Sequence, residues 1–192
     1  MKKTRLLSMS ALALASSLTL SGCTALVVGA TAVGISAATD TRSVGTQLDD
    51  QTIEVRVITA LQTDDRFDES RIQVVSFNRS VLLLGQVGNS SLRDLASHVV
   101  RNTKGVDRVH NELKVAPVIS FGQISKDTYI TSKIKAKFVA DDVIKASDIK
   151  VVTEGGEVAL MGIVSRDVAQ QAIEIARNIN GVTRVIDAFD AR

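Results

Sequence analysis

The sequence carries one segment twice. The 38 residues that start at Asp50 read DQTIEVRVITALQTDDRFDESRIQVVSFNRSVLLLGQV, and those that start at Asp127 read DTYITSKIKAKFVADDVIKASDIKVVTEGGEVALMGIV. Twelve aligned positions are identical, and the match resumes one residue out of step, with Gly105 opposite Gly181. A repeat of this length predicts two copies of one module. The stretch VAPVISFGQIS, which holds the only proline, joins them.

The periodicity inside each copy predicts the order helix, strand, strand, helix, strand. In the second copy Ile130, Ile134 and Phe138 recur every fourth residue, which places them on one face of a helix. A hairpin follows, in which Gly155 and Gly156 supply the positive φ that a tight turn needs.

Two further positions are expected to mark helix ends. Asp127 is predicted to cap the first helix of the second copy, and Gly181 to cap the second helix at its carboxyl end. A module of about 65 residues can form only a small core. We therefore predict an α+β fold in which two helices pack on one face of a three-stranded mixed sheet, in each of two tandem domains.

The first 22 residues have the layout of a secretory signal peptide. Lys2, Lys3 and Arg5 precede an apolar run that is too short to span a bilayer comfortably. The sequence LSGC, which ends at Cys23, resembles the bacterial lipoprotein box L-[AS]-[GA]-C. That resemblance implies cleavage before Cys23, attachment of lipid to its thiol, and acylation of the new amino terminus by palmitate or a similar chain. The alternative is an ordinary secreted protein in which this lone cysteine is incidental.

The segment after the cysteine is expected to be a tether. Residue 24 is threonine, not the aspartate that retains enteric lipoproteins at the inner membrane, so the resemblance implies the outer membrane and its periplasmic face. Residues 24–39 are apolar but small, which favours a tether or membrane-hugging segment over a second span. The predicted divisions are signal peptide 1–22, lipidated amino terminus and tether 23–47, first domain 48–115, linker 116–124 and second domain 125–192.

The charge of the chain gives no sign of a nucleic-acid partner. The leader carries three of the 23 basic residues and none of the 21 acidic residues, so the mature chain has a net charge of about −1.

No residues predict catalysis, a metal site or a cofactor. The two histidines, His98 and His110, occur in the first copy only. The acidic pairs Asp64–Asp65 and Asp141–Asp142 each follow a helix, and we expect solvated turn residues there, not a cation site. Gly155–Gly156 lacks the lysine-bearing helix of a phosphate-binding loop. A non-enzymatic protein is therefore expected.

Motifs in both copies resemble the BON domain. The strand pattern V-x-L-x-G-x-V occurs at Val81–Val87 and Val158–Val164, and a helix end of the form N-x-x-G-V-x-x-V occurs at Asn178–Val185. Lipoprotein box, tether, two modules and linker follow one another as in the DolP family of Gram-negative outer-membrane lipoproteins with two BON domains. This resemblance covers essentially the whole mature chain.

The two copies differ most around their first helices. The second copy carries Lys126, Lys133, Lys135 and Lys137 there, whereas the first copy is acidic on balance. At 100° per residue, Lys126, Lys133, Lys137 and Tyr129 form one strip beside the buried stripe, and Lys135 lies on the other side. A tyrosine among ammonium groups suits an anionic membrane surface, because the ring settles at headgroup level and the lysines meet phosphates. The alternative is a set of exposed lysines that only make the helix soluble.

The family resemblance indicates the same helix. In the DolP family, the first helix of the second BON domain binds anionic phospholipid, notably phosphatidylglycerol. The resemblance also implies a role in outer-membrane integrity and recruitment to the division site. It places Gly122, Ile124 and Ser125 in the loop before the helix. The implied phospholipid-binding residues are Gly122, Ile124, Ser125, Lys126, Tyr129, Lys133 and Lys137.

Two other functions remain open at this stage. The protein is a protein-interaction module if an exposed sheet edge accepts a strand from a partner such as the outer-membrane assembly machinery. A chaperone-like module that holds unfolded outer-membrane proteins would instead need an exposed apolar groove.

Overall fold

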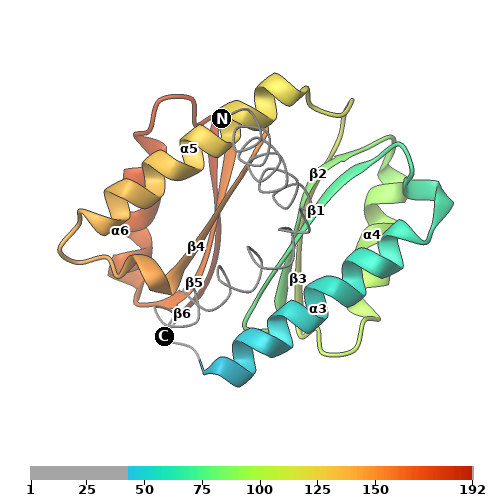
Figure 1. Cartoon of the computed structure of the whole chain (residues 1–192), viewed down its shortest axis with the longest axis horizontal. Helices are drawn as coiled ribbons and strands as arrows, with labels where there is room; N and C mark the ends of the chain where they lie inside the picture. Colours follow the sequence, from blue (N-terminus) through green and yellow to red (C-terminus); the bar gives the residue numbers. More distant parts are fainter. Residues whose placement is uncertain (1–42, 192) are drawn as a thin grey trace, which may run out of the picture. The chain divides into compact units, whose positions relative to one another are not determined.

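Each copy of the repeat folds in the predicted order of helix, strand, strand, helix and strand (Figure 1). The computed structural model describes residues 43–191, so the predicted signal peptide, Cys23 and most of the predicted tether lie outside the described residues. The first module comprises α3 (Val44–Gln62), η1 (Asp65–Phe67), β1 (Arg71–Phe77), β2 (Ser80–Val87), α4 (Ser90–Arg101) and β3 (Arg108–Val115). The second comprises α5 (Phe121–Val139), η2 (Ala146–Asp148), β4 (Ile149–Glu154), β5 (Glu157–Val164), α6 (Arg166–Arg177) and β6 (Arg184–Ala191).

Both sheets are mixed and have the same topology. Their strand orders are β1-β2-β3 and β4-β5-β6. The central strand pairs antiparallel with the strand before it, through a hairpin, and parallel with the strand after it. Gly155 and Gly156 have φ of 60° and 80°, as the hairpin prediction required. The predicted α+β fold, with two helices and a three-stranded mixed sheet in each domain, is confirmed.

A buried aspartate joins the first helix of each module to its hairpin turn. Asp127 accepts hydrogen bonds from the backbone amides of Gly155 and Gly156, at 2.7 and 2.9 Å. Asp50 accepts from the amides of Asn78 and Arg79, at 2.7 and 2.8 Å. A buried carboxylate that accepts several amide hydrogens is well compensated, so this contact fixes the position of helix and turn.

The prediction that Asp127 caps its helix was therefore wrong. α5 begins at Phe121, within the stretch expected as linker, and the Ser120 side chain accepts a hydrogen bond from the Gln123 amide as the cap. α6 also ends differently from the prediction. Its cap is Asn178, and Gly181 lies three residues later in the following turn with φ of 97°.

The helices of each module cover the outer face of its own sheet. In the first module Ile53, Val57 and Leu61 of α3 pack with Ala96 and Val100 of α4 above β1 and β2. The second module repeats this with Ile130, Ile134 and Phe138 of α5 and small residues of α6. The expected stripe on the first helix of each module is thus in the core.

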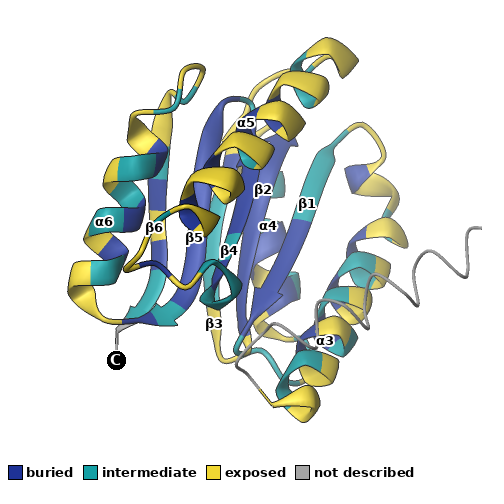
Figure 2. Ribbon diagram, turned by 60° about the vertical axis from the view of Figure 1, so that its left-hand side comes forward, coloured by how far each residue is buried: buried dark blue, intermediate teal, exposed yellow. Residues whose placement is uncertain are grey.

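The inner faces of the two sheets pack against each other. Leu82 and Leu84 of β2 share one apolar cluster with Ala159 and Met161 of β5, and each of these side chains is at most 1% exposed. Consecutive apolar residues along a strand are typical of burial on both faces. Figure 2 shows the central strands buried, with exposed residues on the outer sides of the helices. The described residues 43–191 accordingly belong to one compact unit.

Charged side chains from both modules pair at the border of this layer. Arg71 Nε donates to Glu154 Oε1 at 2.9 Å. Glu157 of β5 accepts from Arg184 Nε at 2.7 Å and forms an ion pair with Lys114 Nζ of β3 at 2.9 Å. The ion pairs that cross from one module to the other are Arg71–Glu154, Lys150–Glu54, Lys114–Glu157, Arg184–Glu112 and Arg108–Asp190.

Glu157 gives this border a pH dependence. Burial alone would raise its pKa, but hydrogen bonds from Arg184 and Lys114 outweigh that effect and hold the pKa below its ordinary value. A carboxyl whose pKa is lowered on folding stabilises the fold above its unfolded pKa. That contribution is lost as the pH falls through the lowered pKa.

We predict that Glu157→Gln lowers the free energy of unfolding at pH 7 by roughly 1 to 3 kcal/mol, because the charged hydrogen bonds are lost. The difference from wild type should shrink below about pH 4, where the unfolded carboxyl is protonated. Denaturant unfolding at several pH values measures both effects. Glu174→Gln is the control, since Glu174 and its partner Arg177 are both exposed and should contribute little. A difference that persists undiminished at pH 3 would show that the charge is not its cause.

Candidate functional site

Helix α5 carries every residue of the predicted site except Cys23, which lies outside the described part of the chain. Its 19 residues make a rod of about 28 Å. Ile130, Ile134 and Phe138 hold one face in the core, and Asp127 ties the helix to the hairpin turn. The opposite face is therefore held in a fixed position toward solvent.

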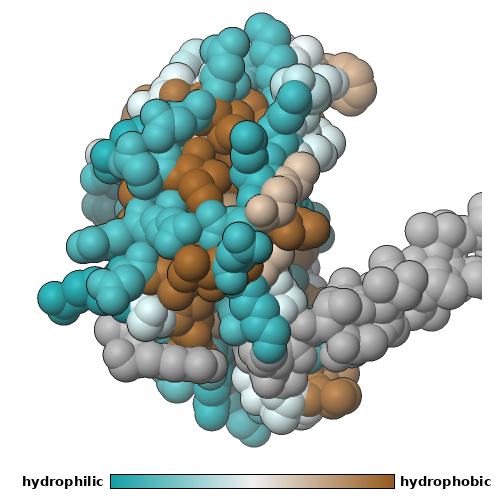
Figure 3. All heavy atoms as spheres, turned by 90° about the vertical axis from the view of Figure 1, so that its left-hand side faces the viewer, coloured by the Kyte–Doolittle hydropathy of each residue, from teal (hydrophilic) through white to brown (hydrophobic). Residues whose placement is uncertain are grey.

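The four residues of the predicted strip lie together on this exposed side. Lys126, Lys133 and Lys137, called the cationic strip below, are exposed and form no ion pair with a described residue. Tyr129 is 60% exposed. Its ring centroid lies 5.2 Å from Lys133 Nζ, within the range of a cation–π contact. Figure 3 views the side of the molecule that carries α5 and α6, where hydrophobic groups lie between hydrophilic side chains.

Two large apolar residues of α5 were missed in the sequence. Phe121 is 82% exposed and Val139 is 76% exposed, at the two ends of the helix. They are 18 residues apart, which at 100° per residue is five full turns, so they project on the same side. Tyr129 projects 80° from them. Phe121, Tyr129 and Val139 are called the apolar crest below, and the cationic strip runs along one flank of it.

The spacing of Phe121 and Val139 was visible in the sequence, but it was not used to predict the crest. Phe121 fell in the predicted linker because the helix was expected to begin at Asp127, and its projection was therefore not considered. Because α5 begins earlier than predicted, Phe121 is part of the helix.

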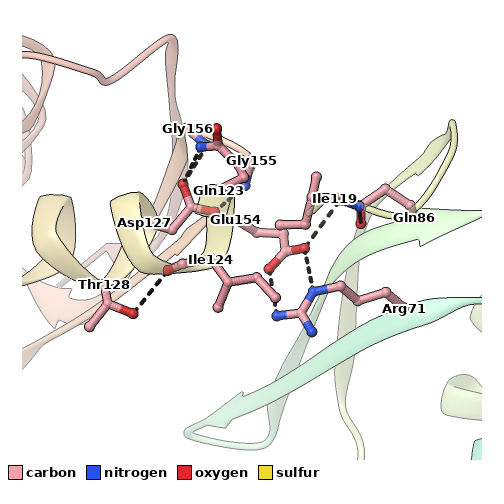
Figure 4. A network of polar contacts seen from close by, with 10 residues as sticks. All are labelled: Arg71, Gln86, Ile119, Gln123, Ile124, Asp127, Thr128, Glu154, Gly155 and Gly156. Atoms are coloured by element: carbon pink, nitrogen blue, oxygen red, sulfur yellow. Dashed lines mark hydrogen bonds and ion pairs between the residues drawn. The ribbon is translucent and has the colours of Figure 1, made fainter. Parts of the chain in front are cut away.

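The remaining predicted residues do not form a loop. Gly122, Ile124 and Ser125 lie in the first turns of α5, which corrects the expectation that they lead into it. Gly122 and Ser125 are exposed, close to the crest. Ile124 is half-buried on the other flank and extends toward the Arg71–Glu154 pair of the module border (Figure 4).

The equivalent helix of the first module has no cationic strip. The residues of α3 that align with Lys126, Lys133 and Lys137 are Asp49, Arg56 and Ala60, whose formal charges sum to zero. Thr52 aligns with Tyr129. The outward face of α3 also exposes apolar residues, including Val44, Leu48 and Val55, but Arg56 is the single basic residue of that helix.

The histidines and acidic pairs considered in the sequence do not form a reactive cluster within residues 43–191. No three potential metal ligands lie together within residues 43–191. Asp64 accepts hydrogen bonds from Arg66, and Asp141 from the amides of Val143 and Ile144, so both aspartates hold turns. The Ile144 and Val143 amides also lower the pKa of Asp141. None of the helices in the described range is long and apolar enough to cross a bilayer.

Comparison with known proteins gives the following similarities. Residues 49–117 and 126–192 each match the BON domain. The chain is 45% identical over 180 residues to the outer membrane lipoprotein DolP of Haemophilus influenzae, with 93% of each chain covered. It is 43% identical over 152 residues to the 21 kDa hemolysin of Actinobacillus pleuropneumoniae, covering 79% of this chain and 78% of that one. The osmotically-inducible protein Y of Escherichia coli K12 is 34% identical over 145 residues, covering 74% and 72%.

Tyr129 provides a direct test of the exposed face, because the chain has one tyrosine and no tryptophan. Its emission therefore reports this site alone. We predict that acrylamide quenches Tyr129 in the folded chain in proportion to its 60% exposure, relative to the same chain unfolded in guanidinium chloride. Strong protection of the ring in the folded chain would contradict the exposed position.

Proposed function

The chain belongs to the BON-domain family of DolP-type outer-membrane lipoproteins, and from this premise we propose that it binds anionic phospholipid, phosphatidylglycerol in particular, through α5. It is a lipid-anchored protein of the outer membrane. In this proposal it faces the periplasm and acts without catalysis.

The observation that carries the proposal is the apolar crest with the cationic strip along its flank. Transfer of one large apolar side chain from water contributes about 1.5–3 kcal/mol when burial is complete. Each lysine near an anionic surface contributes about 1 kcal/mol. Because Phe121 and Val139 stand at opposite ends of the helix, both reach the surface only if α5 lies flat on it.

The anchor and the helix support each other. Lipid on Cys23 would hold the chain at the membrane, since each buried methylene contributes about 0.8 kcal/mol and several chains together bind stably. The 21 peptide units that join Cys23 to Val44 reach at most about 75 Å when extended. A helix confined this close to a bilayer meets it at high effective concentration, so a weak surface contact is sufficient.

The wider role in the proposal follows from two attachment points. A protein that holds acyl chains at one end and anionic headgroups at the other supports the integrity of the outer membrane. We also propose recruitment to the division site, as the family resemblance implies. The cationic strip is the feature that would respond to local enrichment of anionic lipid.

The alternative functions have less support in the described residues. At the β1 edge, the Ser76 amide donates to Glu54 Oε1 at 2.7 Å and the Ser76 carbonyl accepts from Lys150 Nζ at 3.4 Å, so a partner strand at this edge would have to displace both contacts. A partly apolar pocket of about 250 Å³ lies beside Leu61 and Phe67 in the first module. That volume holds a single side chain and not an unfolded segment.

Charge reversal tests the proposal. In the chain from residue 24 onward, which retains both cores and the layer between the sheets, Lys133→Glu with Lys137→Glu should weaken binding to phosphatidylglycerol vesicles by at least about thirtyfold. Co-sedimentation at low and high salt measures this. The control is Arg101→Glu with Lys104→Glu, an equal change of charge at exposed positions of the first module.

Equal loss of binding in both double variants would show that only net charge matters. Unchanged binding in the α5 variant would overturn the proposed site. An interaction with an outer-membrane assembly protein that survives the α5 reversal would favour the protein-interaction function instead.

A further inference from the structure

A cleft of about 390 Å³ runs along α5 on the flank opposite the cationic strip. Its walls come from α5, from the edge strand β4 and from β1 of the first module, so it exists only where both modules meet. The side chains that the following argument uses are Arg71, Gln73, Thr128, Ser132, Lys135 and Glu154.

Three charged groups of the cleft already have hydrogen-bond partners within the protein. Arg71 donates twice to Glu154, at 2.9 and 3.4 Å. Asp127 accepts from Gly155, Gly156 and the Gln123 side chain. Figure 4 shows these two networks on either side of Ile124. Arg71 and Glu154 offset each other's charge. Asp127 keeps its negative charge, but both of its carboxylate oxygens already accept hydrogen bonds from neutral amides.

Other polar groups of the cleft can still accept a hydrogen bond from a ligand. The Gln73 Oε1 atom has no hydrogen-bond partner in the described part of the chain and no surface open to water, so a ligand donor meets it only when the Gln73 side chain rotates into the cleft. An unsatisfied buried acceptor costs about 1–3 kcal/mol, so a donor that reaches it is favoured. The hydroxyls of Thr128 and Ser132 donate to backbone carbonyls of their own helix, which leaves their oxygens as acceptors.

Lys135 supplies the free charge of the cleft. It is exposed and has no ion pair with any residue from 43 to 191. The cleft therefore presents several acceptors and one ammonium group. The ligand that matches this set has hydroxyl donors together with a single negative charge.

We propose that this cleft selects the headgroup of the bound lipid, with Lys135 at the phosphate and Gln73 Oε1 accepting from a headgroup hydroxyl. The inference rests on the proposed function, because the cleft opens on the flank of the helix whose crest meets the membrane. Its volume is at the lower end of the range for ligand pockets, about 300–1,000 Å³, and suits a small polyol phosphate without its acyl chains. The first module thus supplies a specificity-determining residue to a site on the second.

The test compares two lipids of equal charge. Phosphatidylglycerol carries headgroup hydroxyls, and phosphatidylmethanol carries none. For vesicles with equal fractions of either lipid in phosphatidylcholine, we expect the chain from residue 24 onward to prefer phosphatidylglycerol by about five- to tenfold, the contribution of one or two hydrogen bonds.

Gln73→Met keeps the length of the side chain but removes the acceptor. We expect it to reduce the ratio of the two affinities to about one. Gln170→Met on the exposed side of α6 is the matched control and should keep the preference. Thermal unfolding of both variants checks their folds, and the Gln73 substitution should not lower stability because Oε1 has no protein partner to lose.

The outcomes separate this inference from the proposed function. Equal binding of the wild-type chain to both vesicles would overturn the headgroup site and leave membrane binding by α5 in place. No binding to either vesicle would overturn the proposed function itself. Free glycerol 1-phosphate, titrated while the Gln73 side-chain amide is followed by NMR, distinguishes the source of the ligand. Saturable shifts that phosphatidylglycerol vesicles do not compete away would assign the cleft to a soluble polyol phosphate and overturn the lipid assignment.

Discussion

The two sheets of this protein bury their inner faces against each other, and the outer positions of helices α3, α4, α5 and α6 follow from that contact. A module of about 65 residues buries little surface alone, and its central strand is apolar on both faces. One face is covered by the module's own helices. The other is covered by the second copy, through Leu82, Leu84, Ala159 and Met161. Once the sheets are paired, α3 and α5 have no place except the outside, where their outward faces meet solvent or a membrane.

The duplication separates residues that make the fold from residues that can change. Asp50 and Asp127 are buried, hold equivalent hairpin turns and are identical in the two copies. On the outward face of the first helix no such constraint acts, because a side chain there touches only solvent in the isolated protein. That is where α5 carries lysines and a tyrosine, whereas the aligned positions of α3 hold Asp49, Thr52, Arg56 and Ala60. The cleft beside α5 adds a second consequence of the pairing, since Gln73 reaches it from the other module.

Local patterns were sufficient to predict the elements of each module. The four-residue spacing of Ile130, Ile134 and Phe138 gave the buried stripe, and the glycine pair gave the hairpin, because both depend on residues close in sequence. The role of Asp127 was mistaken because helix caps and turn-binding carboxylates use the same residue type. The observed cap, Ser120, lies seven residues before the predicted cap, Asp127, and this error hid Phe121.

Local sequence patterns could not predict the contacts between residues that are far apart in the sequence. The facing of the two sheets was signalled only by consecutive apolar residues, such as Val81 to Leu84, which show that a second face is buried but not what covers it. The Arg71–Glu154 and Lys114–Glu157 pairs join residues more than 40 positions apart, and no local spacing specifies them. The cleft depends on the same long-range contact, so its combination of Gln73 with Lys135 emerged only from the folded chain.

The central claim is that α5 lies flat on the lipid surface while α3 stays clear of it. Paramagnetic broadening of backbone amides by a lipid-soluble spin label, in phosphatidylglycerol micelles, tests this for the whole chain at once. We expect broadening from Phe121 through Tyr129 to Val139, with Val44 and Leu48 of α3 unaffected. Equal broadening on both helices, or broadening confined to one end of α5, would contradict the flat, one-sided attachment.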